Sequence, residues 1–414
     1  MLAPLRSRAF RLLWVGQSVS VIGDGLVIVA IGLVVTRLTG DPGDVGVVLA
    51  AYSVPLVLLV LLGGVLADRL PRQAVMVATD ALRAAAHLAL AVLLATGWVR
   101  IWHMVVIGLV FGASQAFFQP AYTGLVPQTV PESDIQAAQA LGGISRELAS
   151  FVSPALATLL VFTVGGAAAF ALDGMTFTVS ALTLLWVRPR PRGTPGTRTG
   201  LLRELREGWT ALRQRAWVWA TIAAFCLAIL VALGPFFVLG PTVSRAVYGT
   251  DAVYGISSAM WGIGTVVGTV AGGNWHPRRP MLVGLLAGAF WPAQIALFAV
   301  GPPLAVLYGF TILTGVGLGL FDVWWQTALA LRIPAHLLSR VSAWDWMGSL
   351  ALLPLGYLLA GPVAAAVGGV HVLLAGGLVG TAVLLLALAP ASTRQLTDAG
   401  LDAPRAPVFA RLPE

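Results

Sequence analysis

The sequence predicts an all-α membrane protein in which twelve transmembrane helices form two pseudo-symmetric six-helix bundles. Of its 414 residues, 58% are apolar and only 10% are charged, whereas roughly 25% are charged in an average soluble domain. Twelve apolar runs approach or exceed the length of about 20 residues that crosses a bilayer. These runs are continuous, which excludes the alternating strands of a transmembrane β-barrel.

The expected spans are separated by clusters of glycine, proline and charged residues. The first six cover residues 10–36, 45–67, 74–96, 101–126, 136–163 and 165–187. The last six cover residues 216–245, 252–275, 281–300, 303–329, 340–362 and 367–389. The chain therefore divides into an N-terminal bundle (1–187), a linker (188–215), a C-terminal bundle (216–390) and a tail (391–414).

The linker is the clearest shift of composition in the chain. Its first part is rich in proline and glycine, and its second part places apolar side chains at helical spacing opposite arginines: Leu201, Leu202, Leu205, Trp209 and Leu212. This pattern suits a helix lying on the anionic inner leaflet. A solvated hinge with incidental leucines is the alternative.

Arginine placement predicts the orientation of the spans, since basic residues accumulate in cytoplasmic loops. With the N-terminus inside, 20 of the 25 basic residues lie in inner segments and three, Arg37, Arg100 and Arg245, in outer loops. We therefore expect a multi-pass protein of the cell (inner) membrane with both termini in the cytoplasm.

Several chemistries lack their residues. All 25 basic residues are arginine, so the lysine of a phosphate-binding loop or a Schiff base is missing. The five histidines and the single Cys226 are dispersed in the sequence without metal-ligand spacing. We expect no metal, no cofactor, no nucleic-acid partner and no enzyme activity.

One inter-span loop carries a motif. Gly64-x-x-x-Asp68-Arg69-x-Pro71-Arg72 resembles the loop signature of the major facilitator superfamily, with proline in place of a glycine. Further segments are similar to its drug exporter branch, which includes macrolide efflux proteins and the enterobactin exporter: Phe10–Gly25, Ala116–Ala121, Phe170–Ala181 and Arg340–Pro362. The resemblance implies the major facilitator fold, and an inner gate at Gly64, Asp68, Arg69 and Arg72.

A second family mark is the antiporter motif of the fifth span. It falls on Ala149, Ser153, Pro154 and Ala157, with small residues replacing its glycines. We expect these positions to serve close packing. Glycines at four-residue spacing, Gly264, Gly268 and Gly272 in one span and Gly315 and Gly319 in another, predict close helix contacts as well.

Asp24 is the strongest candidate for proton coupling. It lies about 12 residues, or roughly 18 Å, inside the first span, and shares a polar face with Gln17 and Ser20. A carboxylate there is costly unless it is paired, hydrated or protonated. Arg146, at similar depth in the fifth span, needs an anion, which either Asp24 or the adjacent Glu147 could supply. The alternative is a permanent ion pair that fixes packing.

Other charged residues have weaker interpretations. Asp80, Arg83 and His87 form a self-neutralising stripe on the third span, which we interpret as structural. Asp173 needs an unidentified partner, and Asp345, near a span end, is expected to reach water.

The resemblance also implies that the first, fourth, seventh and tenth spans line the substrate cavity. Candidate substrate contacts lie on three of these spans: Gln17 and Ser20 on the first, Gln115, Gln119 and Tyr122 on the fourth, and Asp322 and Gln326 on the tenth. Trp324 and Trp325 fit the interfacial aromatic belt better.

These observations predict a proton-coupled exporter of hydrophobic or amphiphilic small molecules that works by alternating access. The expected partners are a small-molecule substrate, protons and the lipid bilayer, and we expect a monomer. A narrow exporter of one endogenous metabolite or siderophore is the alternative. Sodium remains open as the coupling ion.

Overall fold

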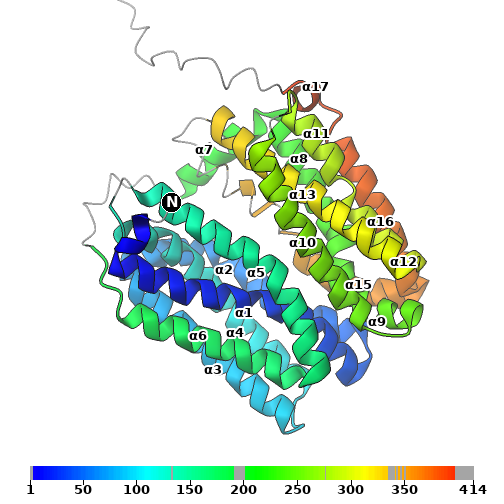
Figure 1. Ribbon diagram of the computed structural model, residues 1–414, viewed down its shortest axis with the longest axis horizontal. Coiled ribbons are helices and arrows are strands. Elements are labelled where there is room, and N and C mark those ends of the chain that lie inside the picture. Colours follow the sequence, from blue (N-terminus) through cyan, green and yellow to red (C-terminus); the bar gives the residue numbers. More distant parts are fainter. Residues whose placement is uncertain are drawn as a thin grey trace, which may run out of the picture.

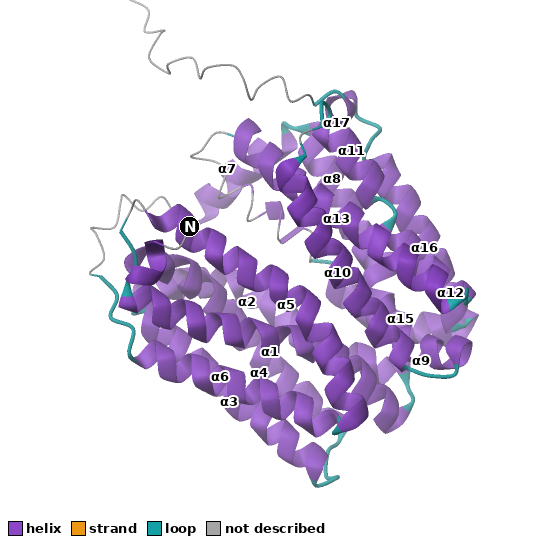
Figure 2. Ribbon diagram, viewed as in Figure 1, coloured by secondary structure: helices purple, strands orange, loops and turns teal. Residues whose placement is uncertain are grey.

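The computed structural model describes residues 3–131, 134–190, 201–275, 277–333, 341, 344–345, 347–348 and 351–396. In this part of the chain the only regular structure is helical (Figure 2). Among the described residues, ten helices are long and apolar enough to cross a membrane, and two shorter apolar helical stretches accompany them: Val152–Thr163, which is part of a longer helix, and Leu353–Val367. The expected all-α membrane architecture is therefore confirmed.

The helices follow the predicted spans closely. The N-terminal half holds α1 (Arg8–Thr39), α2 (Pro42–Arg69), α3 (Arg72–Ala95), α4 (Ile101–Leu125), α5 (Ile135–Thr163) and α6 (Gly166–Leu185). After α7 (Leu201–Arg213) in the linker come α8 (Ala216–Ala228), a π segment (Ile229–Leu233), α9 (Gly234–Tyr248), α10 (Ala252–Asn274), α11 (Pro280–Gly288), α12 (Trp291–Val300), α13 (Leu304–Arg332), α15 (Leu353–Val367), α16 (Gly369–Leu386) and the short α17 (Ala391–Arg394).

Two predicted spans depart locally from a regular α-helix. The span at 216–245 contains the π segment, followed directly by Gly234 and Pro235. The span at 281–300 breaks after Gly288, and Pro292 stands in the first turn of the next helix. Proline removes a backbone donor and crowds the preceding turn, which explains the π segment before Pro235 and the break before Pro292.

Helix α7 confirms that the apolar spacing in the linker forms a helix. Its Leu212 is buried, and the ring of Trp209 lies 5.0 Å from that of Trp344. The C-terminal part of α7 therefore packs against protein.

Glycine contacts confirm the close packing expected between two spans of the C-terminal half. A Cβ atom at Gly264 would lie 2.1 Å from the carbonyl oxygen of Ile312, and one at Gly268 would lie 2.1 Å from that of Val316. Only glycine lets α10 and α13 approach this closely.

The α1–α6 bundle and the α8–α16 bundle come together at one end of the molecule (Figure 1). We call this the α9 end, because it holds Arg37, Asp251 and the C-terminus of α9; the opposite end, near α7, is the linker end. The contacts at the α9 end join α5 to α10, α2 to α15 and α1 to α9. There, Gly255 packs on Thr158, and Gly46 on the backbone of Tyr357.

Candidate functional site

A cavity of about 180 Å³ opens between α1, α4 and α5 of the N-terminal bundle. Its lining side chains are mostly polar or aromatic: Trp14, Gln17, Ser18, Asp24, Gln115, Phe118, Gln119, Tyr122, Ser145 and Arg146. Sequence reasoning had selected six of these residues, Gln17, Asp24, Gln115, Gln119, Tyr122 and Arg146. Ser20, by contrast, is buried and is not among the residues that line the cavity.

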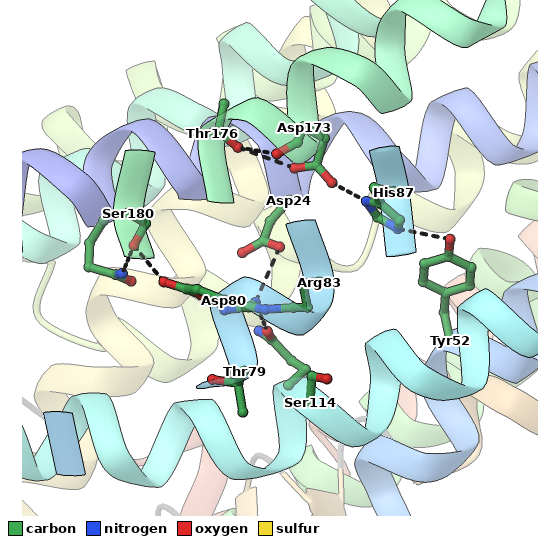
Figure 3. A network of polar contacts seen from close by, with 12 residues as sticks. Asp24, Tyr52, Thr79, Asp80, Arg83, His87, Ser114, Asp173, Thr176 and Ser180 are labelled. Atoms are coloured by element: carbon green, nitrogen blue, oxygen red, sulfur yellow. Dashed lines mark hydrogen bonds and ion pairs between the residues drawn. The ribbon is translucent and has the colours of Figure 1, made fainter. Parts of the chain in front are cut away.

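Asp24 lies between this cavity and the interior of the bundle. Its side chain is 28% exposed, and its Oδ1 atom lies 3.7 Å from Nη1 of Arg83 on α3 (Figure 3). That distance exceeds a hydrogen bond, and among the described residues the buried Oδ1 has no hydrogen-bond partner. A buried carboxylate oxygen without a hydrogen bond is costly while it carries charge.

The expected pairing of Asp24 with Arg146 is not observed. Both residues line the same cavity, but the cation nearest to Asp24 is Arg83. Arg146 is exposed, and no ion pair is found for it within the described part of the chain. The side chain of Glu147, its other expected partner, lies outside the described residues.

Arg83 is completely buried and joins three helices. It donates to Asp80 on its own helix and to the amide oxygen of Gln115 on α4. Its guanidinium carbon lies 4.3 Å from the ring centre of Phe118 and 4.2 Å from that of Phe177, which are favourable cation–π distances. The sequence predicts a stripe on α3 that neutralises its own charges. In the structure this stripe also contacts the cavity wall, because Arg83 binds Gln115 and lies over Phe118.

A second connection runs from the cavity wall to Asp80. The amide of Gln17 donates to Ser180 Oγ at 2.8 Å, and Ser180 donates to Asp80 at 2.6 Å. Both Ser180 and Asp80 are buried. Sequence reasoning missed Ser180, although its place on the face of α6 that also carries Asp173 and Thr176 marks a polar side of that helix.

Asp173 obtains the partner that the sequence did not identify. Its carboxylate is hydrogen bonded to Nδ1 of His87, and the other ring nitrogen of His87 lies 3.0 Å from the hydroxyl of Tyr52. His87 and Asp173 are fully buried. The polar network thus contains three carboxylates, Asp24, Asp80 and Asp173, and one guanidinium, that of Arg83 (Figure 3).

The α1–α5 contact forms the cavity wall. Ser18 and Ser145 share a hydrogen bond of 2.7 Å, and the indole of Trp14 donates to the carbonyl oxygen of Leu141. Deeper along the same contact, Ser153 donates to the carbonyl of Ile22 and packs against Gly25. The fifth-span motif therefore has the packing role expected for it.

The C-terminal half corrects two expectations. Asp345 does not reach water: it is buried and accepts a hydrogen bond of 2.9 Å from the indole of Trp325. Trp324 and Trp325 are likewise buried rather than part of an exposed belt. Asp322 and Gln326, the expected substrate contacts on α13, are exposed.

At the predicted inner gate, Arg72 donates to the carbonyl oxygen of Gly124 at the end of α4. Gln73 donates to the carbonyl oxygens of Leu184 and Val187 at 2.7 and 2.8 Å. These bonds tie the start of α3 to the ends of α4 and α6. The surroundings of Gly64 and the side chains of Asp68 and Arg69, the other expected gate positions, lie outside what the structure describes.

A charged cluster links the bundles at the α9 end. Asp251 accepts hydrogen bonds from Arg37 at 2.9 and 3.3 Å and from Arg245 at 2.9 Å. Arg37 also donates to the carbonyl oxygen of Val161 and lies over the ring of Phe162. Burial alone would raise the pKa of Asp251, but the hydrogen bonds and charges of the two arginines outweigh it, so the pKa lies below the usual value.

Comparison with known proteins shows the family. Residues 1–279 match the model of a family described as transmembrane secretion effectors. The chain belongs to this family, a branch of the major facilitator superfamily. It is therefore a multi-pass membrane transporter of small molecules rather than an enzyme.

Two relatives of this transporter are named as efflux proteins. It is 25% identical over 279 residues to macrolide efflux protein A of Streptococcus pyogenes, covering 66% of this chain and 69% of that protein. It is 27% identical over 362 residues to the multidrug efflux pump Tap of Mycobacterium tuberculosis, covering 84% of each.

Solved transporters share the fold. The nucleoside transporter NupG superposes with a TM-score of 0.70 at 15% identity, over 92% of this chain and 98% of that one. A bacterial homologue of the human lysosomal transporter Spinster, in an inward-facing and unoccupied conformation, gives a TM-score of 0.70 at 14% identity, over 94% and 96%. The major facilitator fold expected from the sequence is confirmed.

Proposed function

We propose that this exporter is proton-coupled, and that it moves hydrophobic or amphiphilic small molecules by alternating access with Asp24 as the exchangeable proton site. The supporting observation is the position of Asp24, which borders the cavity on one side and Arg83 on the other. An acid inside a membrane protein is a functional candidate by default.

Two states of Asp24 have different partners in this proposal. When a proton is bound, the neutral carboxyl no longer needs the charge of Arg83, and its lone buried oxygen costs less. When the proton leaves, the carboxylate attracts Arg83 and any cationic group in the cavity. Substrate and proton therefore compete for one site, which is what exchange requires.

The charged groups facing Asp24 come from several helices. Arg83 and Asp80 lie on α3, Asp173 on α6, and Arg146 borders the same cavity from α5. Arg146 is placed to repel a cation or to bind an anionic group of the substrate. We propose that Arg146 selects among substrates according to their charge.

The direction of access follows from the arrangement of the bundles. We propose that the linker end is cytoplasmic, since most arginines of the inter-span segments fall there. The bundles contact each other at the α9 end, where Arg37 and Asp251 connect them. On this orientation the structure is inward-facing.

The substrate class rests on the cavity and the relatives. Aromatic and amide side chains such as Trp14, Phe118 and Gln119 suit an amphiphilic organic molecule held by stacking and a few hydrogen bonds. The printed names of the relatives, macrolide efflux and multidrug efflux, support drug-like substrates. We propose that the exporter acts as a monomer.

The test is accumulation of ethidium and a macrolide in efflux-deficient cells that express wild type or Asp24→Asn, with and without a protonophore. We expect lower accumulation with wild type only, and loss of this difference with the protonophore. Asp41→Asn, at an exposed acid that accepts from the backbone of Gly43, is the matched control and should behave as wild type. Export that persists in Asp24→Asn would contradict the role of Asp24; no export of either compound would favour a narrow metabolite exporter.

A further inference from the structure

His87 occupies a buried site that the function proposed above does not use. It is held between Asp173 of α6 at Nδ1 and Tyr52 of α2 at Nε2. Its ring stacks on Phe111 at 4.7 Å and meets the edge of Phe170 at 5.7 Å. Two helices besides α3 thus supply a polar partner, and both ring nitrogens are engaged.

The two partners of His87 differ in a way that suits a change of protonation. The carboxylate of Asp173 can only accept while it is ionised, so it fixes a hydrogen on Nδ1 in either state of the ring. The hydroxyl of Tyr52 can donate to a neutral Nε2 or accept from a protonated one. A backbone carbonyl at Nε2 would instead favour the protonated ring alone.

The charges around His87 leave room for a proton. Arg83 is the buried permanent cation of the network, against the carboxylates of Asp24, Asp80 and Asp173. Arg146 is exposed at the cavity and is therefore solvated, so it is not counted with the buried charges. Neutrality therefore needs two protons, and a net charge is costly in a low-dielectric interior. One proton can reside on Asp24, and the pair of His87 and Asp173 offers the second place.

The two places are adjacent through α1. A Cβ atom at Gly23 would lie only 2.2 Å from Oδ1 of Asp173, so the backbone next to Asp24 is in contact with the carboxylate that holds His87. Along α3, His87 lies four residues, or about 6 Å, beyond Arg83 toward the α9 end. The remaining neighbours of the ring, Phe111, Phe170 and Phe177, are apolar.

We propose that the pair of His87 and Asp173 is a second proton-binding site, loaded and emptied together with Asp24, so that two protons are exchanged for each substrate molecule. The proton adds to the lone pair of Nε2, which turns the imidazole into an imidazolium, and the hydrogen bond to Tyr52 reverses. The donor is a hydronium ion, which becomes water, or the carboxylic acid of Asp24, which becomes a carboxylate and is protonated again by a hydronium ion from the cavity, so that both sites are loaded. This inference rests on the proposed function only for the exchange of two protons, not for proton binding itself.

The first test measures proton binding without any substrate. Solid-state NMR of the full chain, labelled with ¹⁵N-histidine in lipid vesicles, reports the protonation of each ring between about pH 5 and about pH 9. The signal of His87 is the one that is lost in His87→Gln but kept in the control His371→Gln, which changes an exposed histidine. We expect this signal to change from imidazole to imidazolium as the pH falls. In Tyr52→Phe, which retains the ring, the pH of this change should move. A His87 ring that keeps one protonation state over the whole range would overturn the proposal.

The second test counts protons with ethidium in proteoliposomes at zero membrane potential. With one pH unit across the membrane, two protons per ethidium give a limiting concentration ratio of about 100-fold, and one proton gives about 10-fold. We expect the higher ratio for wild type and the lower one for His87→Gln. A ratio of about 10-fold in both would overturn the second proton. If wild type moves no ethidium, the proposed substrate class fails, while the NMR result still decides whether His87 binds a proton.

Discussion

The charged cluster at the α9 end should hold the two bundles together there, and Asp251→Asn should release them. Asp251 is 6% exposed and accepts three hydrogen bonds from Arg37 and Arg245. The bonds from Arg37 are the ones that cross between the bundles. A charge-assisted hydrogen bond contributes about 1.5–3 kcal/mol, but both arginines are partly exposed and therefore screened.

We therefore expect Asp251→Asn to lower the stability of the closed α9 end by about 1–2 kcal/mol, which shifts the equilibrium between closed and open roughly 5- to 30-fold. A second cavity of about 370 Å³ lies at this end, lined by Asp41 on one side and Ala246 on the other. Because Cys226 is the only cysteine, a Cys226→Ser background accepts spin labels at Asp41→Cys and Ala246→Cys without further changes.

The distance between these two labels is the measurement. Asp251→Asn should add a population at longer distance, whereas Asp44→Asn, which removes a carboxylate from the first turn of α2, should leave the distribution as in wild type. An unchanged distribution in Asp251→Asn would refute the reasoning that this cluster holds the end closed.

The pH dependence of the same distance has a definite sign. The pKa of Asp251 in the closed state lies below the ordinary value of 3.8, because the hydrogen bonds and charges of Arg37 and Arg245 outweigh burial. The stabilisation is therefore fully present above that ordinary value and is lost as the pH falls through the lower, closed-state pKa. The contribution of Asp251 should thus be constant at neutral and mildly acidic pH, and the difference between wild type and Asp251→Asn should vanish only in strong acid.

Three further outcomes follow from the same contacts. Arg83→Gln should destabilise the protein by about 3–5 kcal/mol, because it leaves Asp80 buried without its cation. In a thermal unfolding assay, adding Asp80→Asn to the same chain should restore much of this loss; no recovery would contradict the pairing of Arg83 with Asp80. Gly268→Val should lower the melting temperature because its side chain would meet the backbone of α13, whereas Gly273→Ala, with open space around it, should not; equal effects would contradict the close contact. Arg146→Gln should change thermal stability by less than about 0.5 kcal/mol, because the position is exposed. It should nevertheless alter the pH dependence of ethidium export, and an unaltered pH profile would contradict a role for Arg146 in the cavity mechanism.

The positions of the helices were predictable because a chain in lipid must satisfy its backbone hydrogen bonds within each span. Apolar run length therefore located α1 to α6 to within a few residues. The interruption between α11 and α12 was not predicted, because Gly288 and Pro292 stand apart within an apolar run and do not form a cluster of glycine, proline and charged residues such as separates the predicted spans.

The partners inside the site were not predictable to the same degree. Depth along a helix follows from residue number, and Arg83 and Arg146 both lie near the middle of their spans. Which of them faces Asp24 depends on how α3 and α5 are rotated against α1, and a single sequence does not determine this. One signal was available: Asp173 lacked a partner, and intramembrane ionisable residues tend to pair with each other, so His87 was a candidate partner as well as a member of the stripe on the third span.

Helix α1 connects the features described here. Its 32 residues carry Gln17 and Asp24 at the cavity, and Arg37 at the contact between the bundles. Asp24 and Arg37 are 13 residues apart, or about 20 Å along one helix, and Gly40 ends that helix in the left-handed conformation, with φ of 74°, that glycine adopts without strain. Opening of the α9 end separates Arg37 from Asp251, so it must move α1 relative to α9 and α10. On the proposed function, the helix that binds the proton is therefore the same helix whose movement opens the α9 end of the carrier.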